Sequence, residues 1–291
     1  MPLNKCIMER FMKFSFYAWL AQFIAEKGAE GTAKMAKELG LSGVEILIVS
    51  NPHANVIPDI KTAREMKSVF DSFDLPFVCV SVPATLTKEG AVDITISKLE
   101  IVKELGSPYL HHTLILEDMP RDPEIFRKLA DEAEKIANHA KDLGITVLYE
   151  PQGYCVNGII NYSIFFDEMK KRCENIGVCA DFGNTLFVGE QPTALLKKYA
   201  ADIKHVHIKD YLFKNNGAFD PGDDWYHLPN GNMLYPTFVG HGIVNYIDTL
   251  KVLKDIGYDG YYSIENDMPV SFFRESVLQA KDFAQRVYES L

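Results

Sequence analysis

The sequence is poor in positive charge, and this deficit excludes a large class of functions. Its 291 residues include 30 Lys and Arg against 40 Asp and Glu, which gives a formal net charge of −10 at pH 7. A nucleic-acid-binding surface needs a basic stripe that follows the phosphates, and the sequence contains none. It also lacks any run near the roughly 20 apolar residues that a membrane-spanning helix requires. We therefore expect no nucleic-acid partner and no membrane insertion.

Cysteine is sparse and shows no metal-binding spacing. The five cysteines contain no C-x-x-C pair, whereas a structural zinc site would use several thiolates. Cys79 and Cys179 lie within apolar runs, where a thiol usually behaves as a small core residue. This usage indicates a reducing compartment, and we expect the protein in the cytoplasm. Hydrophobic residues make up 47% of the chain and charged residues 24%, as in a globular protein with a sizeable core.

A short pattern of Lys, an acidic residue, an apolar residue and Gly recurs four times along the chain. Its copies end at Gly40, Gly106, Gly144 and Gly257. Each copy has the parts of a helix C-terminus: a cation near the negative end of the helix dipole, an apolar anchor, and a Gly suited to left-handed backbone. An apolar, strand-like run follows each copy within a few residues. The pattern therefore predicts repeated units of helix followed by strand.

Amphipathic stripes and apolar runs define those units. Residues 125–143 and 60–73 each carry a one-faced apolar stripe at helical spacing. We place strands near 13–17, 43–48, 77–82, 109–115, 145–150, 177–182, 203–208 and 260–265. Eight strands that alternate with helices predict an α/β fold, a single (β/α)₈ TIM barrel domain over residues 1–291. A doubly wound open sheet is the main alternative, but no G-x-G-x-x-G turn occurs. Residues 211–240 form an inserted loop after the seventh strand, either a lid or an oligomer contact.

Residues with metal-ligand chemistry end the last four predicted strands, where a barrel carries its active site. They are Glu150, Asp181, His207 and Glu265. One such carboxylate alone could be a salt-bridged core residue, since a charge at the end of an apolar strand must be paired or coordinated. Three carboxylates and an imidazole at equivalent points instead predict one bound divalent cation. We expect Mn²⁺, with Mg²⁺, Co²⁺ or Zn²⁺ as alternatives.

Further candidates follow from the two-residue period of strands. If His207 faces the barrel interior, His205 and Lys209 do too. We expect His205 to fill a core layer, and Lys209 to hold a substrate oxygen or donate a proton. Only one of the adjacent His111 and His112 can face inward. His112 is the preferred substrate-binding residue of the two.

Two other residues are candidate substrate contacts. Glu45 follows the entry to the second strand, and it either binds substrate, supports a ligand from behind, or pairs with a cation. Trp19, like Tyr17, follows the first strand and could pack against a sugar face, although core packing and contact with a partner subunit are equal alternatives.

These residues resemble the sugar phosphate isomerase/epimerase family, the xylose isomerase-like TIM barrels that also include inosose dehydratase. The resemblance covers nearly the whole chain and includes Gly-Val-Glu at 43–45, the four ligand segments and His-Ile-Lys-Asp at 207–210. It implies that the four strand-end residues bind one divalent metal ion. It also implies that Glu150 and Glu265 act as the catalytic acid and base.

Departures from the family patterns narrow the function. No His ends the third strand, and Asn184 stands where a trinuclear zinc endonuclease would carry another ligand. Val156 replaces the further glutamate typical of ketose 3-epimerases, while the long insertion resembles inosose dehydratase. The leading hypothesis is a metal-dependent sugar isomerase or epimerase that moves a proton next to a carbonyl through an enediolate. Alternatives are an inosose-type dehydratase acting on a keto-inositol and a non-catalytic metal- or sugar-binding barrel. We expect a small sugar-like substrate and a homo-oligomer.

Overall fold

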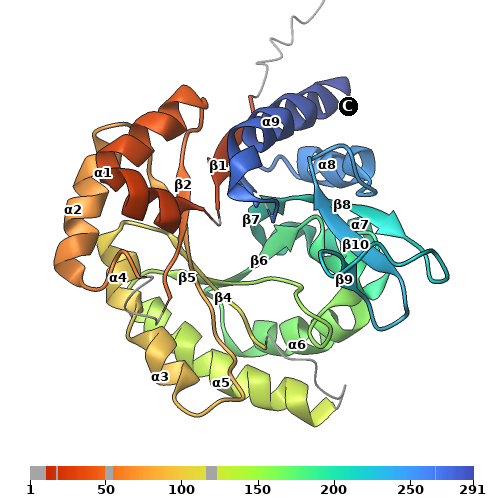
Figure 1. Cartoon of the computed structure of the whole chain (residues 1–291). Coiled ribbons are helices and arrows are strands. Elements are labelled where there is room, and N and C mark those ends of the chain that lie inside the picture. The colour runs from red at the N-terminus through yellow and green to blue at the C-terminus, as the bar shows by residue number, and fades with distance from the viewer. Residues whose placement is uncertain (1–10, 18, 50–54, 116–122, 266) are drawn as a thin grey trace, which may run out of the picture.

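The eight predicted strands form one parallel sheet that curves into a nearly closed barrel (Figure 1). The computed structural model describes residues 11–17, 19–49, 55–115, 123–265 and 267–291. The order around the barrel is β1-β11-β7-β6-β5-β4-β3-β2, and the end strands are linked by a hydrogen bond from Ser42 N–H to the Phe14 carbonyl (2.9 Å). The strands are β1 (Lys13–Phe16), β2 (Val44–Leu47), β3 (Phe77–Val82), β4 (Tyr109–His112), β5 (Thr146–Tyr149), β6 (Ile176–Asp181), β7 (Ile203–Ile208) and β11 (Tyr261–Ile264). The predicted TIM barrel is confirmed, although the fourth strand ends at His112 rather than at 115.

Helices surround this barrel on its outer face (Figure 1). They are α1 (Leu20–Glu38), α2 (Ile60–Asp71), α3 (Ala91–Ile96), α4 (Leu99–Glu104), α5 (Pro123–Asp142), α6 (Gly158–Arg172), α7 (Thr193–Lys198), α8 (Tyr246–Asp255) and α9 (Phe273–Ser290), with 3₁₀ turns η1 (Asn184–Val188), η2 (Ala200–Asp202) and η3 (Val270–Phe272). The predicted stripe on α5 is buried, from Leu129 through Ala140. All four recurrent glycines have the expected positive φ, between 66° and 74°. The repeated helix-stop pattern was therefore a true signal of βα units. Among the described helices, none combines the length and the apolar character needed to cross a lipid bilayer.

Aromatic side chains fill the layer between the sheet and the helices. Tyr149 of β5 packs edge-on against Phe165 of α6, with ring centroids 5.1 Å apart. The hydroxyl of Tyr162, also on α6, donates a hydrogen bond to the Tyr149 carbonyl (2.9 Å). These rings are fully buried. The layer holds β5 in place just before the chain reaches Glu150.

The insertion after β7 is a small sheet of its own rather than a loop. It contains β8 (Asp210–Lys214), β9 (Tyr226–His227) and β10 (Met233–Thr237), which pair antiparallel in the order β8-β10-β9. The Asp210 carboxylate closes it at its base, because it accepts hydrogen bonds from the N–H groups of Gly240 and Gly242 (both 3.0 Å) and Val244 (3.1 Å). Figure 1 shows this sheet at the side of the barrel near α7, not across its centre.

Candidate metal centre

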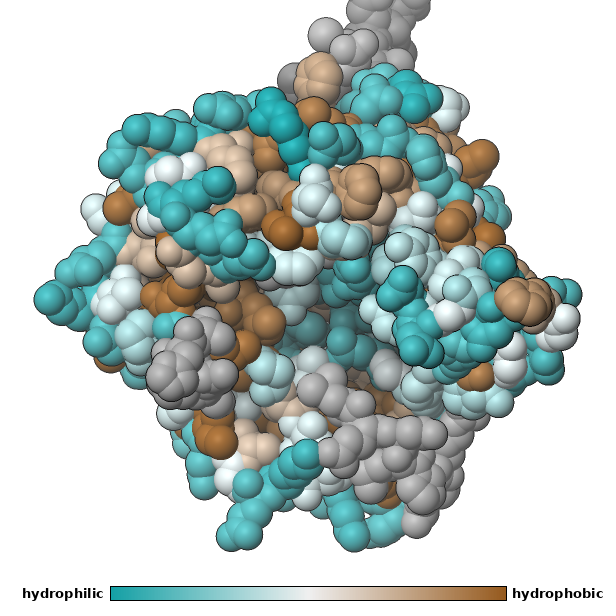
Figure 2. Space-filling view, in the orientation of Figure 1, coloured by the Kyte–Doolittle hydropathy of each residue, from teal (hydrophilic) through white to brown (hydrophobic). Residues whose placement is uncertain are grey.

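The four strand-end residues converge on one point at the C-terminal mouth of the barrel. Glu150 follows β5, Asp181 ends β6, His207 lies in β7 and Glu265 follows β11. Each offers one ligand atom, and these four atoms all lie within 4.8 Å of one another. Figure 2 shows a hollow at the centre of this face, lined mainly by hydrophilic residues. Segments that are far apart in the sequence thus create a single cluster of negative charge.

His207 is the nitrogen donor at the centre of this cluster. Its Nδ1 lies 2.7 Å from Glu150 Oε1 and 3.1 Å from Glu265 Oε2. Burial lowers the pKa of His207, but Cys179 and the neighbouring carboxylates more than offset this effect and raise the pKa well above its ordinary value. Without a metal ion, the imidazole therefore carries a proton that helps to balance the carboxylates. A cation bound at Nδ1 would take the place of that proton.

Lys209 supplies the other positive charge in the cluster. Its ammonium lies 2.9 Å from Glu265 Oε2 and 3.2 Å from Asp181 Oδ2, and its side chain is almost fully buried. Burial raises the pKa of Asp181 to about 8. Burial also raises the pKa of Glu265, but Lys209 and His207 overcome it and leave that pKa below its ordinary value. The position predicted for Lys209 at the mouth of the barrel is thus found.

The donor set fits a hard or borderline divalent cation. Asp181 Oδ2 and Glu265 Oε2 are buried and have no hydrogen-bond partner among the described residues, although both face Lys209. Asp181 is held from its other oxygen by the backbone N–H groups of Gly183 (2.8 Å) and Asn184. Three carboxylates and one imidazole are ligands that Mn²⁺, Mg²⁺ or Zn²⁺ accepts. The Lys209 ammonium offsets only part of the charge of the three carboxylates, and a divalent cation bound among them would balance the rest.

The sulfur of Cys179 lies below this set and makes a poor ligand. It is 3.9 Å from Glu150 Oε1. Burial raises the pKa of the Cys179 thiol, so that the sulfur keeps its proton at neutral pH. A protonated thiol binds metal ions weakly, because the thiolate is the ligand form. The centre therefore relies on oxygen and nitrogen donors.

Glu45 does not reach the mouth, and its expected role as a substrate contact is wrong. Its carboxylate is fully buried behind His207, whose Nε2 lies 3.1 Å from Glu45 Oε2. The same oxygen lies 2.8 Å from His205 Nε2, and Oε1 accepts the hydroxyl hydrogen of Ser81 (2.9 Å). Burial raises the pKa of Glu45, but the two histidines outweigh burial and hold the pKa well below its ordinary value. Glu45 thus supports His207 from behind, which was one of its alternative roles. His205 fills a core layer, as expected.

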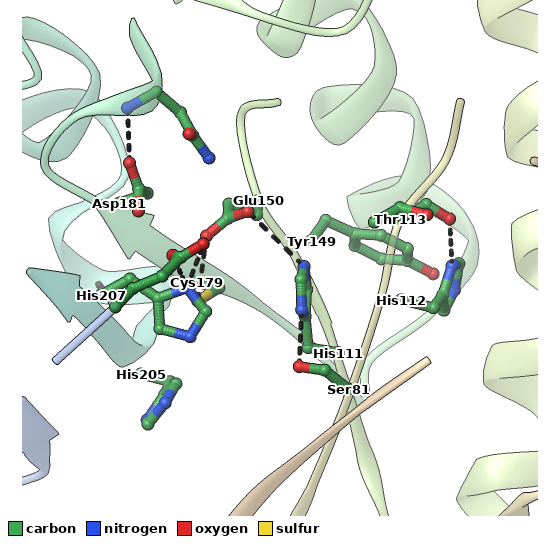
Figure 3. A network of polar contacts seen from close by, with 12 residues as sticks. Ser81, His111, His112, Thr113, Tyr149, Glu150, Cys179, Asp181, His205 and His207 are labelled. Atoms are coloured by element: carbon green, nitrogen blue, oxygen red, sulfur yellow. Dashed lines mark hydrogen bonds and ion pairs between the residues drawn. The ribbon is translucent and has the colours of Figure 1, made fainter. Parts of the chain in front are cut away.

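His112 is also corrected, because its neighbour takes the inward position. The His112 ring packs edge-on against Tyr149, on the helix side of the sheet, and its Nδ1 contacts the carbonyl of Thr113 (3.0 Å). His111 instead faces the cluster, with Nε2 3.8 Å from Glu150 Oε2. Figure 3 shows the two imidazoles on opposite sides of β4. Adjacent strand residues must point to opposite faces, and the sequence did not indicate which of the two pointed inward.

The aromatic ring at the centre belongs to Tyr17 rather than to Trp19. Tyr17 stacks on the His207 imidazole, with centroids 5.2 Å apart and planes inclined by 15°. Trp19 is half-buried and packs against the hydrophobic core. Core packing, the alternative use of that ring, is what the structure shows. Tyr17 borders the metal centre and fixes one face of the imidazole.

Sequence reasoning missed two groups near the centre, one at its rim and one beneath it. Asp267 follows Glu265 by two residues, and its Oδ2 accepts the hydroxyl hydrogen of Tyr211 (2.6 Å), which ties the insertion to the rim of the site. Ser81 lies in the middle of an apolar strand and bridges Glu45 and His111. The strand period could have indicated Ser81, since Cys79 and Ser81 share a face with the barrel interior.

Comparisons with known proteins agree with this architecture. A family model described as a xylose isomerase-like TIM barrel matches residues 33–282. In sequence, the chain is 24% identical over 290 residues to inosose dehydratase 2 of Bacillus cereus, in a match that covers 92% of this chain and 94% of that protein. In structure, it resembles the IOLI protein with a bound zinc atom (TM-score 0.73, 16% identity, 96% and 99% of the two chains). It also resembles an L-ribulose 3-epimerase (TM-score 0.71, 13% identity, 96% and 95%).

Proposed function

The chain belongs to the xylose isomerase-like TIM barrel family, and on this premise we propose that it is a divalent-metal-dependent dehydratase acting on a polyhydroxy ketone such as an inosose. One observation carries the proposal: three carboxylates, one imidazole and one ammonium meet at the mouth of the barrel. The choice of dehydration over isomerisation follows the relatives found by sequence. They are named inosose dehydratases, and the match covers 94% of each of the first two. Dehydration, the first alternative drawn from the sequence, therefore replaces isomerisation or epimerisation as the proposed reaction.

Glu150, Asp181, His207 and Glu265 would hold the metal ion. We keep Mn²⁺ as the expected ion, with Mg²⁺, Co²⁺ and Zn²⁺ as alternatives. When bound, the ion polarises a carbonyl and stabilises the negative charge that develops on its oxygen. The similar IOLI structure carries zinc, so that Zn²⁺ is the first alternative to test.

One of the two glutamates removes the proton from the carbon next to the substrate carbonyl. Glu150 is held by His207 at 2.7 Å, whereas Glu265 is nearer to solvent, with 12% of its side chain exposed. The electron pair of the broken C–H bond forms a new C=C bond, and the C–O bond to the hydroxyl on the next carbon breaks. A positioned general base contributes roughly 10²–10⁴-fold to such a step.

In this proposal, Lys209 protonates the leaving hydroxyl. Burial lowers the pKa of Lys209, but Asp181 and Glu265 outweigh it and raise the pKa well above its ordinary value, so the group is a charged ammonium. The departing oxygen takes one proton from Lys209 and leaves as water. The proton that the glutamate took from carbon then passes to Lys209, whose nitrogen lies 2.9 Å from Glu265. This transfer restores the ammonium and the carboxylate for the next turnover.

Epimerisation is the second candidate function, because the same proton removal serves it. If the proton returns to the opposite face before the C–O bond breaks, the product is an epimer. The similarity to an L-ribulose 3-epimerase structure favours this outcome at the level of the fold. The two reactions differ in one observable, the loss of water.

The test is to incubate the protein, loaded with Mn²⁺ or Zn²⁺, with an inosose in D₂O and to follow the compound by mass spectrometry and NMR. Dehydration gives a product lighter by one water. Epimerisation gives deuterium at the carbon next to the carbonyl without loss of water. Glu150→Gln and Glu265→Gln variants should lose at least about 10²-fold in rate. Full rates in both variants would contradict the proposed proton transfer.

We also propose that the protein works in a reducing compartment, as expected of a cytoplasmic enzyme. Cys79, Cys173 and Cys179 are buried thiols that form no disulfide among the described residues. Buried thiols that stay reduced are typical of a reducing compartment.

A further inference from the structure

A chain of buried hydrogen bonds lies beneath the metal centre and joins strands β2, β3, β4 and β7. Glu45 accepts hydrogen bonds from Ser81, His205 and His207, at 2.8 to 3.2 Å. Ser81 Oγ also lies 2.9 Å from His111 Nδ1. None of these side chains is more than 2% exposed. The chain therefore runs from Glu45 through Ser81 to His111 in surroundings that exclude solvent.

The direction of these bonds fixes where the His111 proton sits. A carboxylate only accepts hydrogen bonds, and a serine hydroxyl has a single hydrogen. Ser81 gives that hydrogen to Glu45, so its contact with His111 must have the imidazole as donor. The proton of His111 is therefore on Nδ1. In a neutral imidazole, Nε2 is then left with a free lone pair.

That lone pair is directed at the metal centre. Nε2 of His111 lies 3.8 Å from Glu150 Oε2, which is too long for a hydrogen bond, and it has no hydrogen-bond partner among the described residues. Figure 3 shows the His111 ring between Ser81 on one side and Glu150 on the other. A gap of 3.8 Å holds no atom on the line between these two acceptors, so a donor to Nε2 must approach from beside Glu150. A hydroxyl group carries the single hydrogen that Nε2 requires.

The same relay sets the ring of His207. Its Nε2 faces Glu45, and its Nδ1 faces Glu150 and Glu265. Both imidazoles thus turn one nitrogen toward the buried relay and the other toward the centre. His111 is not one of the four residues that could hold the ion, so its Nε2 is available to another group.

We propose that His111 is a substrate-contact residue, whose Nε2 accepts the hydrogen of a substrate hydroxyl next to the metal centre. The presence of a polyhydroxy substrate rests on the proposed function, whereas the orientation of the ring does not. Ser81 and Glu45 are positioning residues that act through His111. The contact makes the site selective for substrates that carry a hydroxyl at that point, because a buried acceptor without a donor penalises any substrate lacking one.

The first test needs the protein alone. Two-dimensional ¹⁵N–¹H spectra of histidine-labelled protein, loaded with Zn²⁺, distinguish a proton on Nδ1 from one on Nε2. Wild-type His111 should show the proton on Nδ1, and Ser81→Ala should lose that preference while Ser81→Thr keeps it. A proton on Nε2 in the wild type overturns the proposal.

The second test uses a matched pair of variants. His111→Asn keeps a polar atom near the Nδ1 position and removes Nε2, whereas His111→Gln keeps a polar atom near Nε2. With an inosose as substrate, His111→Asn should lower kcat/KM by about 3–10-fold, the effect of one hydrogen bond, and His111→Gln should lose less. Zn²⁺ affinity, measured by competition with a chelator, should stay within about threefold of wild type in both variants.

The outcomes separate this proposal from the proposed function. Normal turnover by His111→Asn overturns the substrate contact and leaves the dehydratase intact. If the wild type does not turn over an inosose, the proposed dehydratase activity is wrong. The ¹⁵N–¹H spectrum of His111 then tests the orientation by itself: a proton on Nδ1 supports it, and a proton on Nε2 overturns it.

Discussion

Strands β5, β6, β7 and β11 differ from strands β1 to β4 in what they contribute to the candidate metal centre. We call the first set the ligand half; it contributes Glu150, Asp181, His207, Lys209 and Glu265. The second set is the support half; it contributes Tyr17, Glu45, Ser81 and His111. The ligand half presents its charges to the centre, and the support half orients them from behind. The division shows that a second layer of fixed hydrogen bonds orients the residues of the candidate metal site, as is usual for the ligands of metal ions.

The largest effect should come from removing a ligand charge. Asp181→Asn replaces a fully buried carboxylate whose Oδ2 faces the Lys209 ammonium at 3.2 Å, and it removes a charge that the ion would neutralise. Metal affinity should fall by more than the roughly 100-fold upper range seen when a supporting partner is lost. Chelator competition with Zn²⁺ measures it. An unchanged affinity would remove Asp181 from the ligand half.

The next largest effect should come from removing Lys209, which should lower the catalytic rate without lowering metal binding. Lys209→Met removes the proton donor and leaves the ligands, so kcat should fall about 10²-fold or more while the bound metal is retained. Lys209→Arg keeps the charge and serves as control; it should bind metal as the wild type does, because the cation that faces Asp181 and Glu265 remains. A Lys209→Met variant with normal kcat would assign the leaving-group proton elsewhere.

Glu45 tests the support half directly. Glu45→Gln keeps the shape but presents N–H groups to His207 and His205, which need an acceptor. Metal affinity should fall by about 10–100-fold, less than for a ligand. A loss equal to that of Asp181→Asn would erase the distinction between the two halves.

Proton competition gives a smaller, graded effect. Without metal, His207 has a raised pKa and Asp181 a pKa of about 8, so both carry protons at pH 6 to 7 that a bound ion must displace. Both shifts have the same sign, and metal affinity should therefore rise with pH between pH 6 and 8, by up to tenfold per unit for each proton released. Calorimetry in buffers of different ionisation enthalpy counts these protons. Affinity that is flat between pH 6 and 8 would contradict the pKa directions.

The smallest effect should lie outside both halves. Tyr162→Phe removes the buried hydrogen bond to the Tyr149 carbonyl, in the layer between β5 and α6. The free energy of unfolding should drop by about 1–2 kcal/mol, which lowers the Tm by a few degrees. Metal affinity and kcat/KM should stay unchanged. A large loss of activity would show that the aromatic layer helps to place Glu150.

The sequence was sufficient for the barrel and for the convergence of its charges. Recurrent helix stops at Gly40, Gly106, Gly144 and Gly257 marked the units, and all four proved to have left-handed backbone. The residues of the ligand half could be predicted from the ends of the strands, because a charged residue directly after an apolar run is unusual in a sequence. These features are local in sequence, and each has a residue-type signature.

The support half was harder to predict, since its contacts depend on register and on partners far along the chain. The pair His111 and His112 could not be resolved without knowing which residue of β4 faces inward. Glu45 meets His205 across 160 residues, and no short pattern announces that pairing. The insertion likewise folds through pairing of β8 with β10, whose turn region is long and weakly patterned.

The Asp210 carboxylate makes the insertion a self-contained attachment. It gathers the backbone of Gly240, Gly242 and Val244 directly after Lys209, and the approach is so close that a Cβ at Gly242 would lie 2.1 Å from its Oδ1. The chain leaves and rejoins the barrel at one clasp, so we expect changes of length or sequence in residues 215–225 to leave the Lys209 ammonium in place. Grafts at that tip should therefore change the surface beside the mouth and leave the cluster of charges in the barrel as it is.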